Sequence, residues 1–291
     1  MRFEGIFTAM VTPFSGDGLD EAALARFVEW QVSEGVHGLV PCGTTGESPT
    51  LSHDEHKRVI EITVKHAAGK VPVMAGTGSN STTEAVDLSK HAEKAGANAL
   101  LVVAPYYNKP TQEGIYQHFK AVAAATSLPI FVYNIPGRSV INIADATLAR
   151  LAELPNIAGV KDATGDLARV STLRHLVGNR LTLLSGEDMT AVGFNAMGGK
   201  GCISVTSNIA PKACAHIQNL SLAGKYEEAL KAHELLVPLH SSMFCETNPV
   251  PVKHAVSLLG KCSNHVRLPL VGPTSEAQAL VKGAMHAAGL L

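Results

Sequence analysis

The stretch Ile157-Ala158-Gly159-Val160-Lys161 decides the fold, because it combines a short apolar run with a charged group at its carboxyl end. It follows a turn at Pro155-Asn156, and such a run is typical of a strand buried on both faces of a parallel sheet. Burial disfavours the ammonium form of a lysine and leaves a free amine that attacks carbonyl groups. Taken alone, a lysine at a strand end more often extends its amine to solvent.

Seven further apolar runs alternate with amphipathic, alanine-rich segments. The eight predicted strands cover residues 6–11, 38–41, 71–75, 99–103, 129–133, 157–160, 181–184 and 201–205. Two of the intervening helices begin at predicted capping boxes, Ser52-His53-Asp54-Glu55 and Ser81-Thr82-Thr83-Glu84. Eight strand–helix units predict an α/β fold, a (β/α)₈ TIM barrel, with an open doubly wound sheet as the alternative that strand counting leaves open.

The last part of the chain has a different pattern. After Leu220 the helical periodicity continues through residues 226–240, 249–258 and 275–290 without a strand signal. We predict a catalytic barrel domain at residues 1–222 and a C-terminal helical extension at 223–291. The sequence contains no low-complexity linker between them, and the extension either packs on the barrel or forms a subunit contact.

Composition and charge limit the classes of partner. The chain has 291 residues, a hydrophobic fraction of 46% and a formal net charge of -1, which favours small molecules over nucleic acids or membrane surfaces. Its five cysteines are odd in number and form no C-x-x-C pair, which favours a reducing compartment. We find no signal peptide and no membrane-spanning run, and we therefore predict a cytoplasmic protein.

Functional side chains follow several of the predicted strands. The carboxyl ends of barrel strands form the catalytic face, so residues at these ends are interpreted together. The turn after the second strand carries the adjacent hydroxyls of Thr44 and Thr45, which suit an anion. Strands five and six are neighbours, so inward-facing Tyr133 and Lys161 are expected to lie side by side. Arg138, on the loop after Tyr133, has a guanidinium that suits a substrate carboxylate.

An amine beside a phenol predicts Schiff-base chemistry. The carbinolamine needs protons delivered and removed, and a phenol performs this task when its pKa is tuned. Thr44 is expected to pass the proton onward, and Tyr107 is a candidate third member of the relay. Three of the five tyrosines, Tyr106, Tyr107 and Tyr133, fall at or just after strand ends. For each tyrosine alone, a ring packed under a loop is the alternative.

Four motifs together resemble the dihydrodipicolinate synthase family: Gly43-Thr44-Thr45-Gly46-Glu47-Ser48, Tyr106-Tyr107-Asn108-Lys109-Pro110, Tyr133-Asn134-Ile135-Pro136-Gly137-Arg138 and Val160-Lys161-Asp162-Ala163-Thr164-Gly165. The resemblance runs from the first strand to the terminal helices. It implies a homotetramer, a dimer of dimers, that condenses pyruvate with L-aspartate 4-semialdehyde to give the cyclic precursor of diaminopimelate and lysine. It also implies that no metal and no organic cofactor takes part.

The resemblance assigns catalytic roles to four positions. Lys161 corresponds to the Schiff-base lysine, and Tyr133, Thr44 and Tyr107 correspond to the proton relay. In that family the tyrosine at the Tyr107 position reaches in from the neighbouring subunit.

Four further positions correspond to substrate contacts. Thr45 is expected to hold the pyruvate carboxylate, and the backbone at Gly186 and Ile203 is expected to line the same pocket. Arg138 is expected to bind the carboxylate of the aldehyde substrate.

A second, regulatory site for L-lysine is also implied by the resemblance, at a subunit interface. The matching positions are Ser48, Pro49, His53, His56, Asn80, Glu84 and Tyr106. A glutamate suits the ammonium group of an amino acid, and an amide suits its carboxylate. The alternative is that His53, His56 and Glu84 are solvated first-turn residues, with Glu84 closing a capping box.

Related pyruvate-dependent aldolases are the alternative function. N-acetylneuraminate lyase and 2-keto-3-deoxy sugar acid aldolases would share Lys161 and Tyr133, whereas Arg138, the double threonine and Tyr107 favour the semialdehyde. A barrel that only binds a keto acid is disfavoured because every relay position is filled. Residues 76–81 lack the third glycine of a dinucleotide site, residues 198–201 lack the hydroxyl residue of a P-loop, and residues 53–56 lack further zinc ligands.

Overall fold

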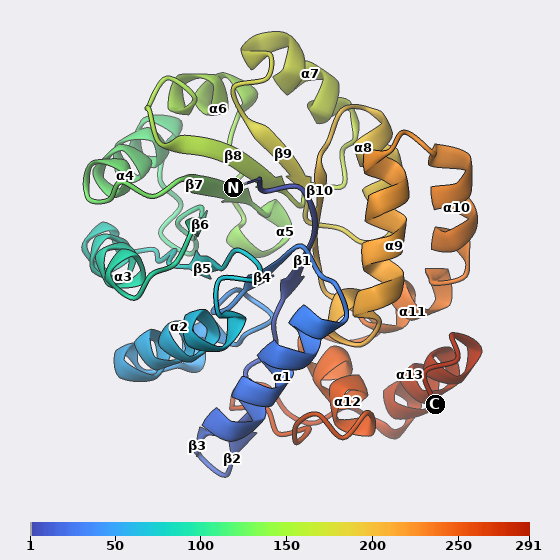
Figure 1. Cartoon of the computed structure of the whole chain (residues 1–291). Coiled ribbons are helices and arrows are strands. Elements are labelled where there is room, and N and C mark those ends of the chain that lie inside the picture. The colour runs from blue at the N-terminus through green and yellow to red at the C-terminus, as the bar shows by residue number, and fades with distance from the viewer. Residues whose placement is uncertain (1) are drawn as a thin grey trace.

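The computed structural model describes residues 2–291, and its eight parallel strands form one barrel surrounded by helices (Figure 1). The barrel strands are β1 (Gly5–Ala9), β4 (Gly38–Val40), β5 (Met74–Gly76), β6 (Ala99–Val103), β7 (Ile130–Asn134), β8 (Ile157–Asp162), β9 (Thr182–Ser185) and β10 (Gly201–Ser204). Their order is β4-β1-β10-β9-β8-β7-β6-β5. Leu39 bridges Val73, and the Leu39 N–H donates to the carbonyl of Pro72 at 3.0 Å. This contact joins β4 to the segment directly before β5, which are the two ends of the strand order. The sheet is therefore a closed barrel, and the open doubly wound sheet is excluded.

The predicted strand positions are confirmed, with small shifts at their ends. The largest shift is at the strand predicted for residues 71–75, where β5 begins only at Met74. Pro72 has no N–H to donate to a ladder, which explains the later start. The antiparallel hairpin of β2 (Phe14–Ser15) and β3 (Gly18–Leu19) was not predicted.

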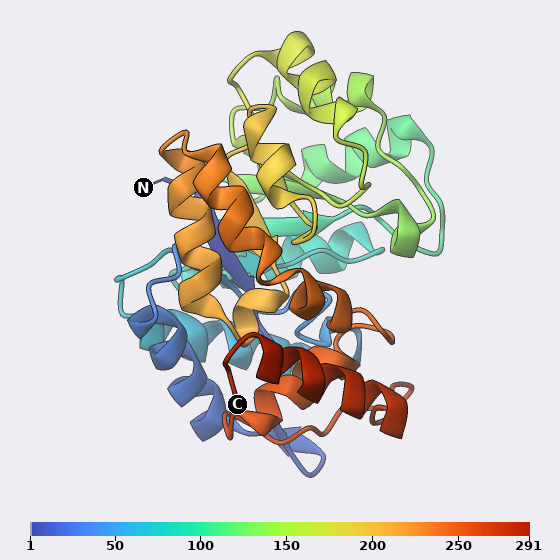
Figure 2. The ribbon, with the colours of Figure 1, turned by 90° about the vertical axis from the view of Figure 1, so that its right-hand side faces the viewer.

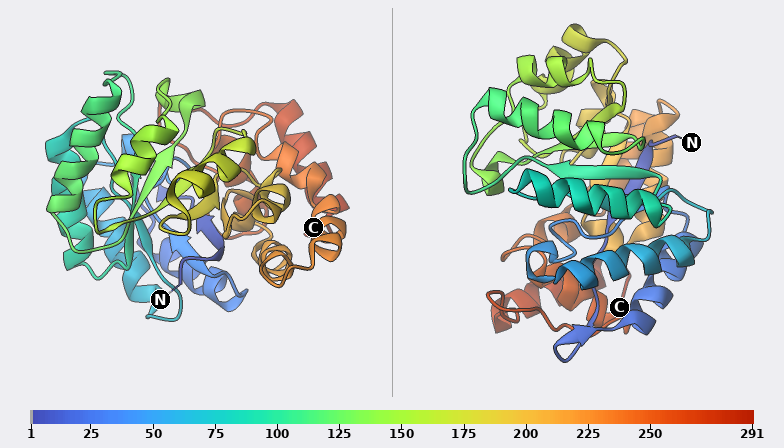
Figure 3. Two further views of the ribbon diagram at one scale, coloured as in Figure 1. Left: turned by 90° about the horizontal axis from the view of Figure 1, so that it is seen from above. Right: turned by 90° about the vertical axis from the view of Figure 1, so that its left-hand side faces the viewer.

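Helices cover the outside of the barrel, as the two views of Figure 3 show. In chain order the outer helices are α1 (Glu21–Ser33), α2 (His53–Ala67), α3 (Thr82–Lys94), α4 (Gln112–Ala124), α6 (Asp145–Leu151), α7 (Ala168–Val177), α8 (Ala191–Ala196) and α9 (Pro211–Leu222). The short helix α5 (Pro136–Ser139) and the 3₁₀ turns η1 (Ser48–Thr50) and η2 (Thr206–Asn208) follow strands β7, β4 and β10. The capping box predicted at Ser52 and Glu55 is confirmed, because both reciprocal hydrogen bonds are present. The capping box predicted at Ser81 and Glu84 is wrong, because the Ser81 side chain accepts no capping hydrogen bond.

The C-terminal residues form four helices, which are α10 (Tyr226–Glu234), α11 (Val237–Ser242), α12 (Val250–Leu258) and α13 (Ser275–Ala287). A single helix over 226–240 was the wrong prediction. Pro238 lies in the first turn of α11, where its missing N–H is tolerated, whereas it would break a continuous helix. Figure 2 shows α12 and α13 side by side, near the blue β2–β3 hairpin. The boundary at residue 222 stays a prediction.

Among residues 2–291 no helix has the length and apolar character needed to cross a bilayer.

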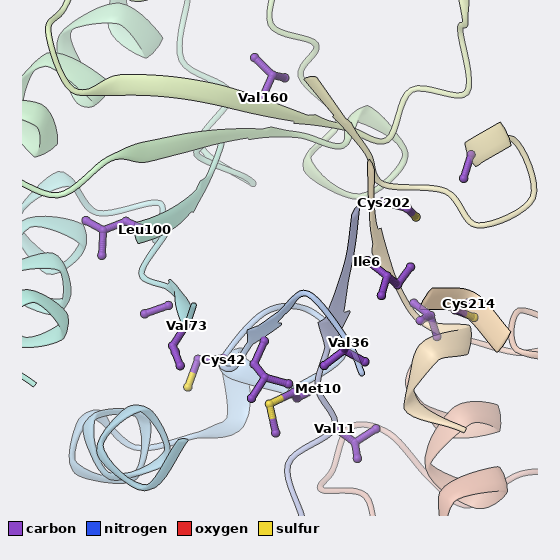
Figure 4. Close-up of a cluster of buried hydrophobic side chains, with 14 of the residues drawn as sticks. Ile6, Met10, Val11, Val36, Cys42, Val73, Leu100, Val160, Cys202 and Cys214 are labelled. Atoms are coloured by element: carbon purple, nitrogen blue, oxygen red, sulfur yellow. The ribbon is translucent and has the colours of Figure 1, made fainter. Parts of the chain in front are cut away.

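Apolar side chains lie in two layers on opposite sides of the strands. The larger layer fills the space between strands and helices and includes Ile6, Leu100, Val160 and Cys202, which point away from the barrel axis in Figure 4. The smaller layer fills the barrel interior and consists of Phe7, Ala9, Val40, Met74, Ala99, Leu101, Phe131, Tyr133, Leu184 and Ile203. This alternation follows the two-residue period of a strand.

Two phenylalanines fill the amino-terminal half of the interior. The Phe3 ring packs against both, with centroid distances of 6.2 Å to Phe7 and 5.3 Å to Phe131. Glycine lies opposite each ring, because a Cβ on Gly38 would be 2.1 Å from Phe7 and a Cβ on Gly159 would be 2.3 Å from Phe131. The interior is therefore closed at this end, and space remains only toward the carboxyl ends of the strands.

Replacing Gly159 by alanine is expected to lower the free energy of unfolding by about 1–3 kcal/mol, because the new methyl group overlaps the buried Phe131 ring. Urea-induced unfolding followed by circular dichroism measures this change. The control is Gly283→Ala on α13, where a Cβ meets nothing within 4 Å and where alanine is expected to stabilise the helix by about 0.5–1 kcal/mol. Equal stability of the Gly159→Ala variant and the wild type would contradict the packing argument.

Candidate active site

A cavity of about 100 Å³ lies at the carboxyl ends of the barrel strands. Six of the residues predicted to carry the chemistry or bind substrate line it: Thr44, Thr45, Tyr133, Arg138, Lys161 and Gly186. They follow or end β4, β7, β8 and β9, so closure of the barrel brings together residues that are far apart in the sequence. The cavity thus combines an amine, a phenol, hydroxyls and a guanidinium.

The amine of Lys161 is buried rather than extended to solvent. Lys161 is 6% exposed on β8 and pairs in register with Tyr133 on β7, as predicted from the adjacency of the two strands. Its Nζ lies 4.2 Å from the centroid of the Tyr133 ring. The amine predicted to be the nucleophile and the phenol predicted to be the acid–base group therefore share one small cavity.

Gly186 leaves room for the lysine side chain. A Cβ at this position would be 2.6 Å from the Cβ of Ala163 and 3.1 Å from the Cε of Lys161. The Gly186 N–H donates to the carbonyl of Asp162 at 2.7 Å, which fixes the turn after β9 against the end of β8. A larger residue here would displace the amine.

Glu187 also lines the cavity and was not predicted. Burial raises the pKa of its carboxyl group, and the nearby Lys161 acts in the opposite direction. Glu187 follows Gly186 just after the carboxyl end of β9. A search for polar residues at the carboxyl ends of the predicted strands, which identified Lys161, would also have found it.

Asn248 connects the two predicted carboxylate-binding side chains and was also missed. Its Nδ2 donates to Thr45 Oγ1 at 3.0 Å, and its carbonyl accepts a hydrogen bond from Arg138 Nη2 at 3.1 Å. Asn248 lies between α11 and α12, in the C-terminal extension. The cavity is therefore completed by a residue from outside the eight strand–helix units.

Two predicted residues lie outside the cavity lining. Ile203 is buried on β10 in the interior cluster that contains Tyr133. Tyr107 is 87% exposed, with a φ of 70° in the left-handed region, and its ring does not reach the cavity of its own chain. The predicted relay is thus incomplete within one described chain.

A second cavity, of about 190 Å³, contains most of the predicted regulatory positions. Six of the seven line it: Ser48, Pro49, His53, His56, Glu84 and Tyr106. The seventh, Asn80, is not among the lining residues, and its carbonyl accepts a hydrogen bond from Asn108 Nδ2 at 2.9 Å. Six of the positions chosen by resemblance therefore line one cavity.

Glu84 gives this second cavity a negative charge. Its carboxylate accepts a hydrogen bond from Ser79 and pairs with His53, and these contacts hold its pKa below the usual value. These partners explain why Glu84 does not close the predicted capping box. Burial lowers the pKa of His56 to about 4, so His56 is neutral at neutral pH.

A third cavity, of about 200 Å³, lies between the other two. It shares Thr44 and Arg138 with the cavity around Lys161, and it shares Ser48 and Tyr106 with the second cavity. The two sites are therefore separated by a few side chains rather than by a packed layer.

Comparison with known proteins gives a consistent result over the whole chain. The model of the dihydrodipicolinate synthetase family matches residues 2–288. The 4-hydroxy-tetrahydrodipicolinate synthase of Afipia carboxidovorans is 59% identical over 290 residues, which cover 100% of this chain and 98% of that protein. The corresponding enzyme of Rhizobium meliloti is 57% identical, with 99% of each chain covered.

Solved structures show the same similarity. The dihydrodipicolinate synthase of Acinetobacter baumannii, crystallised with pyruvate, is 42% identical with a TM-score of 0.98 over 100% of both chains. The enzyme of Cyanidioschyzon merolae with lysine bound is 37% identical with a TM-score of 0.96 over 99% of both chains. Together with the family match and the geometry around Lys161, these similarities show that the chain belongs to the dihydrodipicolinate synthetase family.

Proposed function

We propose that the chain condenses pyruvate with L-aspartate 4-semialdehyde to form 4-hydroxy-tetrahydrodipicolinate, the first committed step of diaminopimelate and lysine biosynthesis. The observation that carries the proposal is the buried amine of Lys161 beside Tyr133, in a cavity that also holds Thr45 and Arg138. This set supplies one nucleophile and separate groups for two carboxylates.

The reaction begins at the Lys161 amine. The amine attacks C2 of pyruvate, and loss of water from the carbinolamine gives an imine, with Tyr133 delivering and removing protons. Loss of a proton from C3 gives the enamine, whose carbon attacks the aldehyde of the second substrate. The substrate's own amino group then attacks the imine carbon, which closes the ring and releases Lys161. No step oxidises or reduces a substrate, so the mechanism needs no redox cofactor.

The two substrate carboxylates are assigned to different side chains. Thr45, with the backbone around Gly186 and Ile203, holds the carboxylate of pyruvate, and Arg138 holds that of the semialdehyde. The contacts of Asn248 with both Thr45 and Arg138 support this assignment, because they fix the distance between the two groups. Fixed spacing favours the bond between the enamine and the aldehyde.

The proposal includes a homotetramer, built as a dimer of dimers, in the cytoplasm. Tyr107 supports the assembly, because a relay residue that is 87% exposed cannot serve the cavity of its own chain. In the proposed dimer, Tyr107 of one protomer completes the relay of its partner together with Thr44 and Tyr133. The exposed ring is then covered by the partner subunit.

The proposal also includes feedback inhibition by L-lysine at the second cavity. Glu84 binds the ammonium group of the effector, and its lowered pKa keeps it charged at neutral pH. The third cavity supports coupling between the sites, because Tyr106 and Thr44 both line it. A ligand that moves Tyr106 would thereby change the surroundings of the relay.

Sodium borohydride added in the presence of pyruvate is expected to fix a pyruvate-derived mass on Lys161, because it reduces the imine to a stable amine. Mass spectrometry of the digested protein measures the modification. The Lys161→Arg variant is the control and is expected to stay unmodified and inactive. An unmodified Lys161 in the wild type would refute the mechanism.

The same wild-type preparation distinguishes the acceptors. Product formation from pyruvate and L-aspartate 4-semialdehyde in a coupled assay supports the proposal. Trapping at Lys161 combined with cleavage of sialic acid, and no turnover of the semialdehyde, would support another pyruvate-dependent aldolase. Trapping without any turnover would support a barrel that only binds keto acids.

Mixing two inactive variants is expected to restore activity if Tyr107 acts across the subunit boundary. Tyr107→Phe is expected to lower kcat about 10²-fold through loss of the proton relay, and Lys161→Ala to abolish turnover. Each hybrid dimer then has both wild-type side chains in one of its two sites. Because half of randomly assembled dimers are hybrids, about a quarter of wild-type activity is expected in the unselected mixture and more in the doubly tagged fraction. Co-expression with two affinity tags and steady-state assay of the doubly tagged protein test this. Activity no higher than the sum of the two variants would contradict the arrangement.

Millimolar L-lysine is expected to inhibit the wild-type enzyme, and Glu84→Gln is expected to raise the half-inhibitory concentration about tenfold or more, since it removes a charged partner of the ammonium group. Steady-state rates across a lysine titration measure this. Glu93→Gln, on the same helix but bonded to Ser127 instead, is the control and is expected to leave inhibition unchanged. Wild-type rates that do not change with lysine would refute the regulatory site.

A further inference from the structure

A wholly buried ion pair joins the C-terminal extension to the carboxylate-binding loop. Lys253, on α12, places its Nζ 2.6 Å from Glu47 Oε1, and the two side chains are 0% and 1% exposed. Glu47 comes directly after Thr44-Thr45-Gly46, the turn that lines the cavity around Lys161. The pair therefore connects α12 with the turn that carries the two threonines.

The ion pair is supported by further contacts on both sides. The second oxygen of Glu47 accepts a hydrogen bond from the backbone N–H of Arg267 at 3.0 Å. The Lys253 amine lies 3.9 Å from the centroid of the Phe14 ring. Removing two charges from water is costly and is offset only where the geometry is good and the remaining polar atoms are bonded. A pair retained at this depth fixes the relative position of the segments that carry it.

The backbone of Glu47 needs such support. Its φ is 55°, in the left-handed region that residues with a side chain rarely adopt. The turn before it is closed by hydrogen bonds from Gly46 N–H to Gly43 and from Glu47 N–H to Thr44. A conformation of this kind persists where the surrounding contacts hold it. The contacts of the Glu47 carboxylate with Lys253 and Arg267 provide that restraint.

The same segment of the extension holds the turn at a second point. Asn248, just before α12, donates to Thr45 Oγ1 at 3.0 Å and accepts from Arg138 at 3.1 Å. The turn is thus fixed at Thr45 by Asn248 and at Glu47 by Lys253. In Figure 1, α12 is drawn between α1 and α13 at the edge of the barrel; it carries Lys253 and begins two residues after Asn248.

We infer that Glu47 and Lys253 are positioning residues for substrate binding. Through them the C-terminal extension contributes to the geometry of the site. The ion pair sets the position of the Thr44–Thr45 turn relative to Asn248 and Arg138, and so the distance between the two bound carboxylates. The inference rests on the condensation proposed above.

Lys253→Met tests the role of the charge with little change in volume. We expect kcat/KM to fall about 10- to 100-fold, mainly through higher KM values for both substrates, because a small displacement of binding groups has effects of this size. The matched control is Lys231→Met on α10, which removes a lysine whose ion pair with Glu227 is exposed. The control variant is expected to keep wild-type kinetics.

A double variant separates positioning from stability. Lys253→Met alone leaves the Glu47 charge buried without its partner and is expected to lower the thermal midpoint of unfolding. The double variant Glu47→Gln/Lys253→Met removes both charges, so its midpoint is expected to return toward that of the wild type. Its KM values are expected to stay raised, because the turn has lost its attachment to α12. The double variant also provides the test if the single variant does not fold.

The outcomes are distinct. A folded double variant with wild-type KM values for both substrates would overturn the inference, as would a destabilised Lys253→Met variant with unchanged kinetics below its unfolding temperature. Borohydride trapping with pyruvate is expected to need more pyruvate for half-modification in both variants. Failure of the wild type to turn over the semialdehyde would instead refute the proposed function.

Discussion

The packing of Phe7 and Phe131 inside the barrel is the constraint on which the site depends. An eight-stranded barrel has an interior that side chains just fill, so the position of the large residues determines where space remains. Both rings lie toward the amino-terminal end, opposite Gly38 and Gly159. Farther along the same strands the inward residues are Ala9 and Tyr133, which line the cavity. The reactive cavity is therefore the part of the interior that the core leaves unfilled.

Much of the barrel and of its catalytic face could be predicted from the sequence, because both depend on local patterns. Apolar runs indicate the strands, and the order of the strands places Tyr133 next to Lys161 in the observed register. Asn248 could not be predicted in this way. It enters the site through the docking of α12, and the sequence around it carries no strand, no motif and no charge that points to a cavity. Long-range docking of helices depends on the complete shape of both surfaces.

The two predicted capping boxes show the same limit at short range. Ser52 and Glu55 form the reciprocal hydrogen bonds that the pattern predicts. At Ser81 the pattern is equally good, yet Glu84 is bonded instead to Ser79 and to His53 of a different helix. The fold brings the Ser79 hydroxyl and the His53 ring within hydrogen-bond distance of this carboxylate, and it bonds to them instead of to the helix terminus. The sequence shows which residues are able to form a cap, and the tertiary neighbours decide whether they do.

Two buried lysines in this chain differ in a way that bears on reactivity. Lys253 has a carboxylate 2.6 Å from its amine; burial lowers the pKa of this amine, and the Glu47 carboxylate opposes that effect and fixes the side chain. Lys161 is almost as buried, yet no carboxylate in the described chain lies within ion-pair distance of it, and its amine lies 4.2 Å from the centroid of the Tyr133 ring. Burial alone therefore does not identify a nucleophile. The partners of the amine distinguish a buried lysine that is held in an ion pair from one that is available to a substrate, as the proposed mechanism requires.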